Sequence, residues 1–251
     1  MLLVADVHGA AGPLAQVAAQ DETLLVLGDL INFIDYRTNT GIVAQVCGSD
    51  FVAEVVALRS AGLADEARTL WQSFSKGREV ELRAQYDSLI DAAYEEVCLA
   101  LEGSGAIVTY GNVDHPGKLK DHLPPDCRYV VNDVVEVEGL RVGVVGGGLP
   151  SPLGVPGEVS DEVMAQRLAG IGPVDVLCTH VAPAADPLQV DVISGQLKGS
   201  KPLLEHLERT QPPFHYFGDI HQPQASRWVI GNTVSRNVGY FRATTRAVRH
   251  G

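Results

Sequence analysis

No apolar run in this 251-residue sequence reaches the ~18 residues that a helix needs to cross a bilayer, which excludes a membrane-spanning protein. Basic residues are also few: 19 Lys and Arg stand against 31 Asp and Glu, and the formal net charge is −12. A chain this acidic lacks the basic face that attracts phosphate backbones, so we expect no nucleic-acid partner. A small phosphate substrate remains compatible with this charge, because a bound metal ion supplies positive charge locally.

Cysteine is scarce as well. The four cysteines form no C-x-x-C pair: Cys47, Cys98, Cys127 and Cys178. The first residues, MLLVADVHG, show none of the basic character that opens a secretion signal. We therefore expect free thiols, a reducing compartment and a cytoplasmic protein.

The rest of the composition is typical of a globular protein, with 45% hydrophobic and 20% charged residues. The length favours one domain over residues 1–251. Between residues 51 and 101 apolar residues recur at helical spacing, which predicts two or three helices with breaks at Gly62 and Gly77. Strand patterns resume directly afterwards, so this segment is expected to be a helical insertion that covers one side of the site entrance. The oligomeric state stays open.

Short apolar runs predict buried strands, and five of these runs end in residues that commonly bind metals. The runs and the residues after them are 2–5 with Asp6 and His8, 23–27 with Asp29, 106–110 with Asn112, 174–178 with His180, and 215–217 with Asp219 and His221. A hairpin is predicted to turn at Glu138-Gly139. Loops beyond the carboxyl ends of strands in an α/β sheet meet in one crevice, so these side chains are expected to converge. Carboxylate, amide and imidazole donors suit Mn, Fe, Zn and related ions.

These strand ends carry five sequence blocks that resemble the motifs of the calcineurin-like metallophosphoesterase family. The family pattern runs DxH, GDxx(D/N), GNH(D/E), a lone His and GHxH. Here the blocks read DVH at 6–8, GDLIN at 28–32, GNVD at 111–114, His180, and GDIH at 218–221. The third block is similar to that of prokaryotic members that read GNxD. The resemblance implies an α/β fold in which a two-layer β-sandwich is flanked by helices.

The resemblance also implies two divalent metal ions, Mn first and Fe, Zn, Mg or Co as alternatives. One ion would take Asp6, His8, Asp29 and His221, and the other would take Asp29, Asn112, His180 and Asp219. Asp29 would bridge them. Two metals ~3.5–4 Å apart can polarise phosphoryl oxygens and share a hydroxide that attacks phosphorus in line. The implied function is hydrolysis of phosphodiesters or small phosphomonoesters.

One departure from the family pattern concerns the third block. Val113 replaces a His that is often assigned to protonating the leaving group or gripping phosphate. His115 is a candidate substitute, and Asp114 is expected to orient a ligand imidazole. The candidate catalytic set is therefore Asp29, Asn112, Asp114 and His115. Asn112 and Arg37 are candidate substrate-binding residues, with Tyr36 and the insertion forming a substrate wall.

The second departure is Asp219, which replaces a metal-binding His. As a ligand, Asp219 would make the centre neutral once a hydroxide is counted, and a neutral centre is a weaker Lewis acid. Alternatively, Asp219 points away and the second site is weak or empty. Both departures keep a second function open, a catalytically weak or inactive scaffold that binds proteins. A nuclease is disfavoured, because the sequence has no basic stripe interleaved with aromatic residues.

Overall fold

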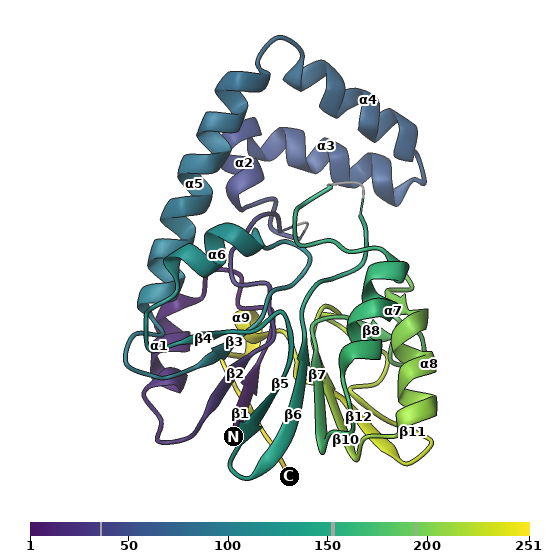
Figure 1. The fold of residues 1–251 in the computed structure, drawn as a ribbon. Helices are drawn as coiled ribbons and strands as arrows, with labels where there is room; N and C mark the ends of the chain where they lie inside the picture. Colours follow the sequence, from purple (N-terminus) through teal and green to yellow (C-terminus); the bar gives the residue numbers. More distant parts are fainter. Residues whose placement is uncertain (36, 152–153, 194) are drawn as a thin grey trace.

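Two β-sheets lie at the centre of the protein, in a computed structural model that describes residues 1–35, 37–151, 154–193 and 195–251 (Figure 1). The first sheet has the order β13 (Val248–Arg249), β1 (Leu2–Val4), β2 (Leu24–Val26), β3 (Ile107–Val108) and β4 (Arg128–Tyr129). The second has the order β11 (Arg227–Ile230), β12 (Thr233–Asn237), β10 (Phe214–Phe217), β7 (Val176–Thr179), β6 (Leu140–Val145) and β5 (Asn132–Val137). A small third sheet pairs β8 (Ala182–Pro183) with β9 (Gly199–Ser200).

The inner strands are parallel, and their apolar runs are buried. β1 pairs in parallel with β2, and β7 lies in parallel between β6 and β10. All residues of β1, β2 and β7 are buried, as expected for strands covered on both faces. One core lies between the two sheets and includes Leu3, Leu25, Val144, Cys178 and Tyr216. The predicted β-sandwich is therefore confirmed.

Helices cover the outer face of each sheet. The first sheet carries α1 (Ala11–Ala18), α5 (Glu79–Leu99) and α6 (Pro116–His122). The second carries α7 (Asp161–Gly170) and α8 (Lys201–Thr210), and the short α9 (Phe241–Thr244) follows β12. Ser160 and Ser200 cap α7 and α8, because their hydroxyls accept the amides of Val163 and Leu203. The two apolar clusters beneath these helices hold the sandwich between two helical layers.

The helical segment between β2 and β3 is longer than predicted. It consists of α2 (Ile42–Cys47), α3 (Ser49–Ser60), α4 (Ala64–Ser75) and α5, so it begins at Ile42 rather than at residue 51. The breaks at Gly62 and Gly77 are confirmed, since both glycines have positive φ angles of 76° and 75°. α3 and α4 lie beyond the carboxyl ends of the central strands, at the upper end of Figure 1.

Several strands are shorter than their apolar runs. β3, for example, covers Ile107–Val108 of the predicted 106–110. The chain leaves the ladder early because tight turns follow the strands: Asp6, after β1, already has a positive φ of 57°. The hairpin of β5 and β6 turns at Glu138-Gly139 as predicted. The four cysteines are free. Among the described residues, no helix is both long and apolar enough to span a membrane.

His215 on β10 is a buried polar residue of the second sheet, away from the strand ends. The Thr179 hydroxyl donates to the Val181 carbonyl and lies 3.0 Å from His215 Nε2, while the Ser235 hydroxyl lies 2.7 Å from Nδ1. Burial first, and the charge of His206 second, lower the pKa of His215 to about 3. The folded protein thus keeps this imidazole neutral while the unfolded chain, with a pKa near 6.5, takes up a proton.

This difference predicts an acid-dependent loss of stability. The contribution of His215 is fully present above about pH 6.5 and is lost as the pH falls toward about 3, at up to ~1.4 kcal/mol per pH unit. Denaturant unfolding of wild type and His215→Asn at pH 7 and pH 5 should show a weaker pH dependence in the variant, by ~2 kcal/mol. His122→Asn, at a partly exposed histidine, serves as the control. An unchanged pH dependence in His215→Asn would contradict this account.

Candidate metal centre

The loops that follow β1, β2 and β10 turn sharply to deliver their side chains. Asp6, His8, Asp29 and Asp219 all have positive φ angles, between 43° and 63°. Such angles are uncommon in residues other than glycine and cluster at functional sites. All four residues are buried. The backbone is therefore shaped to point polar groups inward at the carboxyl edge of the sheets.

Two glycines allow the loops after β2 and β3 to approach each other. A Cβ at Gly28 would lie 2.3 Å from the Gly111 nitrogen, and the φ of Gly28 is 103°. A Cβ at Gly111 would lie 2.1 Å from Asp29 Oδ1 and 2.7 Å from His180 Nε2. Glycine is required at both positions, because any side chain would displace the loop or the predicted ligands.

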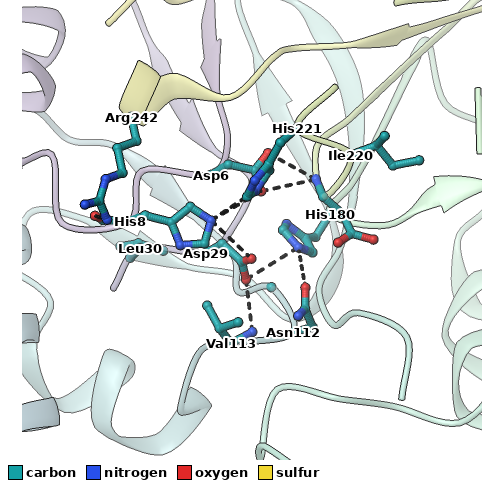
Figure 2. Close-up of polar contacts among 12 residues, drawn as sticks. Asp6, His8, Asp29, Leu30, Asn112, Val113, His180, Ile220, His221 and Arg242 are labelled. Atoms are coloured by element: carbon teal, nitrogen blue, oxygen red, sulfur yellow. Dashed lines mark hydrogen bonds and ion pairs between the residues drawn. The ribbon is translucent and has the colours of Figure 1, made fainter. Parts of the chain in front are cut away.

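The first group of candidate ligands is Asp6, His8 and His221, whose ligand atoms all lie within 4.8 Å of one another. Figure 2 shows the two imidazoles pointing toward each other, with 3.2 Å between their Nε2 atoms. His221 Nε2 is 3.4 Å from Asp6 Oδ1. Segments from the two ends of the chain thus meet at one point.

The second group is Asp6, Asp29 and His180, again within 4.8 Å of one another. His180 Nε2 lies 3.5 Å from Asp29 Oδ1 and 3.1 Å from Asn112 Oδ1. The other oxygen of Asp29, Oδ2, lies 3.7 Å from His8 Nε2. Asp29 therefore faces both groups, which is the position that the family resemblance gives to a bridging carboxylate.

The hydrogen bonds of the histidines fit a cation at this position. His8 Nδ1 is 3.3 Å from the Ile31 carbonyl, and His180 Nδ1 is 2.9 Å from the Leu27 carbonyl. A carbonyl only accepts, so Nδ1 carries the hydrogen and a neutral ring directs the Nε2 lone pair into the centre. His180 Nε2 then meets an acceptor, the Asn112 oxygen. A proton or a metal cation must separate the two, and this donor set suits divalent transition metals.

The electrostatics of the buried groups point the same way. Burial, reinforced by His221, lowers the pKa of His8 to about 3. Burial also raises the pKa of Asp29 to about 7, although the charge of His180 opposes this. For His180 burial acts downward, but Asp29 and then Asp6 outweigh it and raise the pKa to about 9. Without a metal the centre retains protons near neutral pH, and metal binding would release them.

Asp114 does not take its predicted place beside a ligand imidazole. Its carboxylate accepts the backbone amides of Asp29, Leu30 and Gly111 at 2.7, 3.1 and 2.9 Å. The Tyr94 hydroxyl on α5 donates to the same carboxylate at 3.1 Å and accepts the His115 amide. Asp114 is fully buried and positions the loop that carries Asp29.

The neighbours of Asp114 have different surroundings. Val113 is buried, and its backbone amide donates to Asp29 Oδ1 at 3.0 Å (Figure 2). The His115 ring lies against Phe33, with centroids 6.0 Å apart. His115 Nε2 is buried without a hydrogen-bond partner among the described residues, and burial lowers the pKa of this imidazole.

Arg37 reaches the centre through an aromatic stack that sequence patterns do not reveal. The Tyr240 ring stacks on His221 with centroids 3.9 Å apart and 7° between the planes. The Arg37 guanidinium carbon lies 5.4 Å from the Tyr240 centroid, within cation–π distance. Arg242, which the sequence patterns do not single out, is a second cation in this region, and it donates to the His8 carbonyl at 3.1 Å. Tyr36 lies outside the described residues.

Asp219 is placed differently from the other predicted ligands. Its backbone amide donates to both oxygens of Asp6, at 3.1 and 3.2 Å. Its carboxylate belongs to neither ligand group and instead lies 3.6 Å from the Lys198 ammonium. The sequence patterns did not single out Lys198.

Comparison with known proteins supports the fold rather than an activity. No protein-family model and no curated protein matches the chain. One crystal structure matches at a TM-score of 0.58 and 16% identity, covering 96% of this chain and 90% of its own. The crystal structure of TT1561 of Thermus thermophilus matches at 0.55 and 11% identity, covering 98% and 96%. A purple acid phosphatase from yellow lupin seeds matches at 0.42 and 12% identity, covering 95% and 43%. At these identities the first two show a shared fold.

Because the Asp114 carboxylate accepts several buried hydrogen bonds, its substitution should strongly lower the stability of the protein. In Asp114→Asn, an amide nitrogen would face backbone donors and leave buried groups unpaired, so the free energy of unfolding should fall by ~3 kcal/mol. Tyr94→Phe removes one hydrogen bond to the same carboxylate and the acceptor of the His115 amide, and should cost less, ~2 kcal/mol. Denaturant unfolding in the presence of chelator measures both without a contribution from metal. Equal losses in the two variants would contradict a central role of Asp114.

Proposed function

We propose that the protein is a metal-dependent phosphoesterase of the calcineurin-like type, with the GNxD form of the third block. The observation that carries the proposal is the placement of Asp29, which directs one oxygen toward His8 and the other toward His180. This arrangement is a carboxylate between two imidazole-containing groups, inside a buried, acidic centre. The proposed substrates are phosphodiesters or small phosphomonoesters, and the proposed compartment is the cytoplasm.

Two divalent ions at this centre would supply Lewis-acid polarisation of a phosphoryl oxygen and an acidified water molecule. Asp6, His8, Asp29 and His221 would hold one ion, and Asp29, Asn112 and His180 would hold the other. The Ile31 and Leu27 carbonyls fix the ring orientation of His8 and His180, so the imidazoles need little rearrangement on binding. We propose Mn first, with Fe, Zn, Mg and Co as alternatives.

The cations near the centre suit an anionic substrate. Arg37 is exposed and lies near the Tyr240 ring, where its planar guanidinium can pair with two phosphate oxygens. Arg242 lies close to Asp35, 4.0 Å away, and is bound to the His8 carbonyl, so its role is to hold the loop after β1. Asn112 faces the centre from the third block and is the second proposed substrate contact.

The ion pair between Asp219 and Lys198 is the observation that favours a second candidate function, a protein-binding scaffold. With Asp219 held by an ammonium, the second ion has one ligand fewer than the resemblance implies. A protein with a weakened centre of this kind could act as a protein-binding scaffold without turnover. Metal content and hydrolysis separate the two functions directly.

The first test combines metal analysis with hydrolysis of a panel of phosphoesters, with Mn²⁺, without it and with chelator. Hydrolysis should require metal. His8→Ala and His180→Ala should each lower the hydrolysis rate by at least ~10²-fold, because each removes a candidate metal ligand. His206→Ala, at a histidine of α8 outside the centre, is the matched control and should retain the rate. Metal-free protein that binds no Mn²⁺, or full activity in either ligand variant, would refute the proposal.

A second test concerns the leaving group. Valine cannot donate a proton, so activated aryl phosphodiesters should be cleaved far faster than alkyl esters of matched shape, which need protonation of the departing oxygen. If His115 acts as the substitute acid, His115→Ala should slow alkyl esters more than aryl esters. The expectation would be excluded if wild type and His115→Ala each cleaved both ester types at equal rates while the chemical step is rate-limiting.

A further inference from the structure

Lys198 lies beside the candidate metal centre because of the small β8–β9 sheet. β8 begins two residues after His180, and the ladder pairs Ala182 with Gly199. The Lys198 amide donates to the Gln189 carbonyl at 2.8 Å, which fixes the backbone at this point. The Lys198 side chain is 35% exposed and the Asp219 side chain 8% exposed, so the ion pair between them spans from solvent into the centre.

Asp219 contributes to the centre through its backbone and not through its carboxylate. The backbone amide donates to both oxygens of Asp6. The carboxylate is not part of either group of converging ligand atoms, and its Oδ1 lies 3.6 Å from Lys198 Nζ. The Asp219 carboxylate thus pairs with an ammonium, whereas the family resemblance implies that it binds a metal ion.

The ammonium also opposes a second cation by direct repulsion. A carboxylate that is shared with Lys198 has less charge to offer a metal, and a divalent ion near it would face a like charge at short range. Partial exposure of Lys198 screens this repulsion, so we expect a moderate effect and not a complete block.

We propose that Lys198 controls occupancy of the second metal position by binding Asp219, so that the two positions fill at different metal concentrations. The first position, at Asp6, His8 and His221, fills at low metal concentration. The second, at Asp29, Asn112 and His180, fills only at higher concentration. This inference rests on the proposed function, since it assumes a metal centre at these residues.

The test is calorimetric titration of metal-free protein with Mn²⁺, together with electron paramagnetic resonance to detect coupled pairs of Mn²⁺ ions. Lys198→Met should raise the affinity for the second ion at least ~10-fold, and coupled pairs should form at lower Mn²⁺ concentration, because Asp219 becomes free to bind. Affinity for the first ion should stay unchanged. Lys201→Met, at an exposed lysine that begins α8, is the matched control and should behave as wild type.

The double variant Lys198→Met with Asp219→Asn decides the mechanism. The gain over wild type should disappear, because the loss of the Asp219 carboxylate offsets the loss of the repelling ammonium. Lys198→Gln provides a second neutral side chain with the same expectation as Lys198→Met. An unchanged affinity for the second ion in both single variants, or a gain that persists in the double variant, would overturn the inference. In either case Mn²⁺ binding and hydrolysis by wild type would leave the proposed function intact, whereas wild type without any bound Mn²⁺ would refute that function first.

Discussion

The candidate metal centre depends on the hydrogen bonds that the buried Asp114 carboxylate accepts. This carboxylate accepts amides from the loop after β2 and from the loop after β3, so a single buried charge joins two segments that are far apart in the sequence. Hydrogen bonds to an ionised acceptor are the strong ones in proteins, and here they replace the regular ladder at the point where the strands end. Without Asp114, the backbone amides of Asp29, which has a positive φ angle, and of Leu30 would lose this hydrogen-bond acceptor.

The same carboxylate connects the centre to the helical segment. Tyr94 lies on α5, and its hydroxyl both donates to Asp114 and accepts the amide of His115. α5 therefore supports the centre from behind, while α3 and α4 extend beyond the carboxyl edge of the sheets (Figure 1). One helical segment thus combines a structural role at its base with an extension beyond the carboxyl edge of the sheets.

The sequence could predict the strand ends but not the contacts between them. The sequence predicts Asp6, His8, Asp29 and His180 as site residues, because buried strands leave apolar runs and the polar residues at their ends stand out. Tyr240 and Lys198 could not be found in this way, since each reaches the centre through pairing with a distant segment. Asp114 stands out in its block, but most of its partners are backbone amides, which no residue pattern reveals. The early start of the helical segment at Ile42 was missed because α2 is too short to show a period.

Val113 shows how a departure from a motif can be read too strongly. Valine replaces the His of the family motif here, and its side chain can neither protonate a leaving group nor bind phosphate. In the structure its backbone amide donates to Asp29 Oδ1, and this contact is independent of the side chain. The block therefore keeps this backbone contact with valine in place, and the valine side chain is buried. Under the proposed function, valine at this position would alter proton delivery to the leaving group and leave the backbone contact to Asp29 in place.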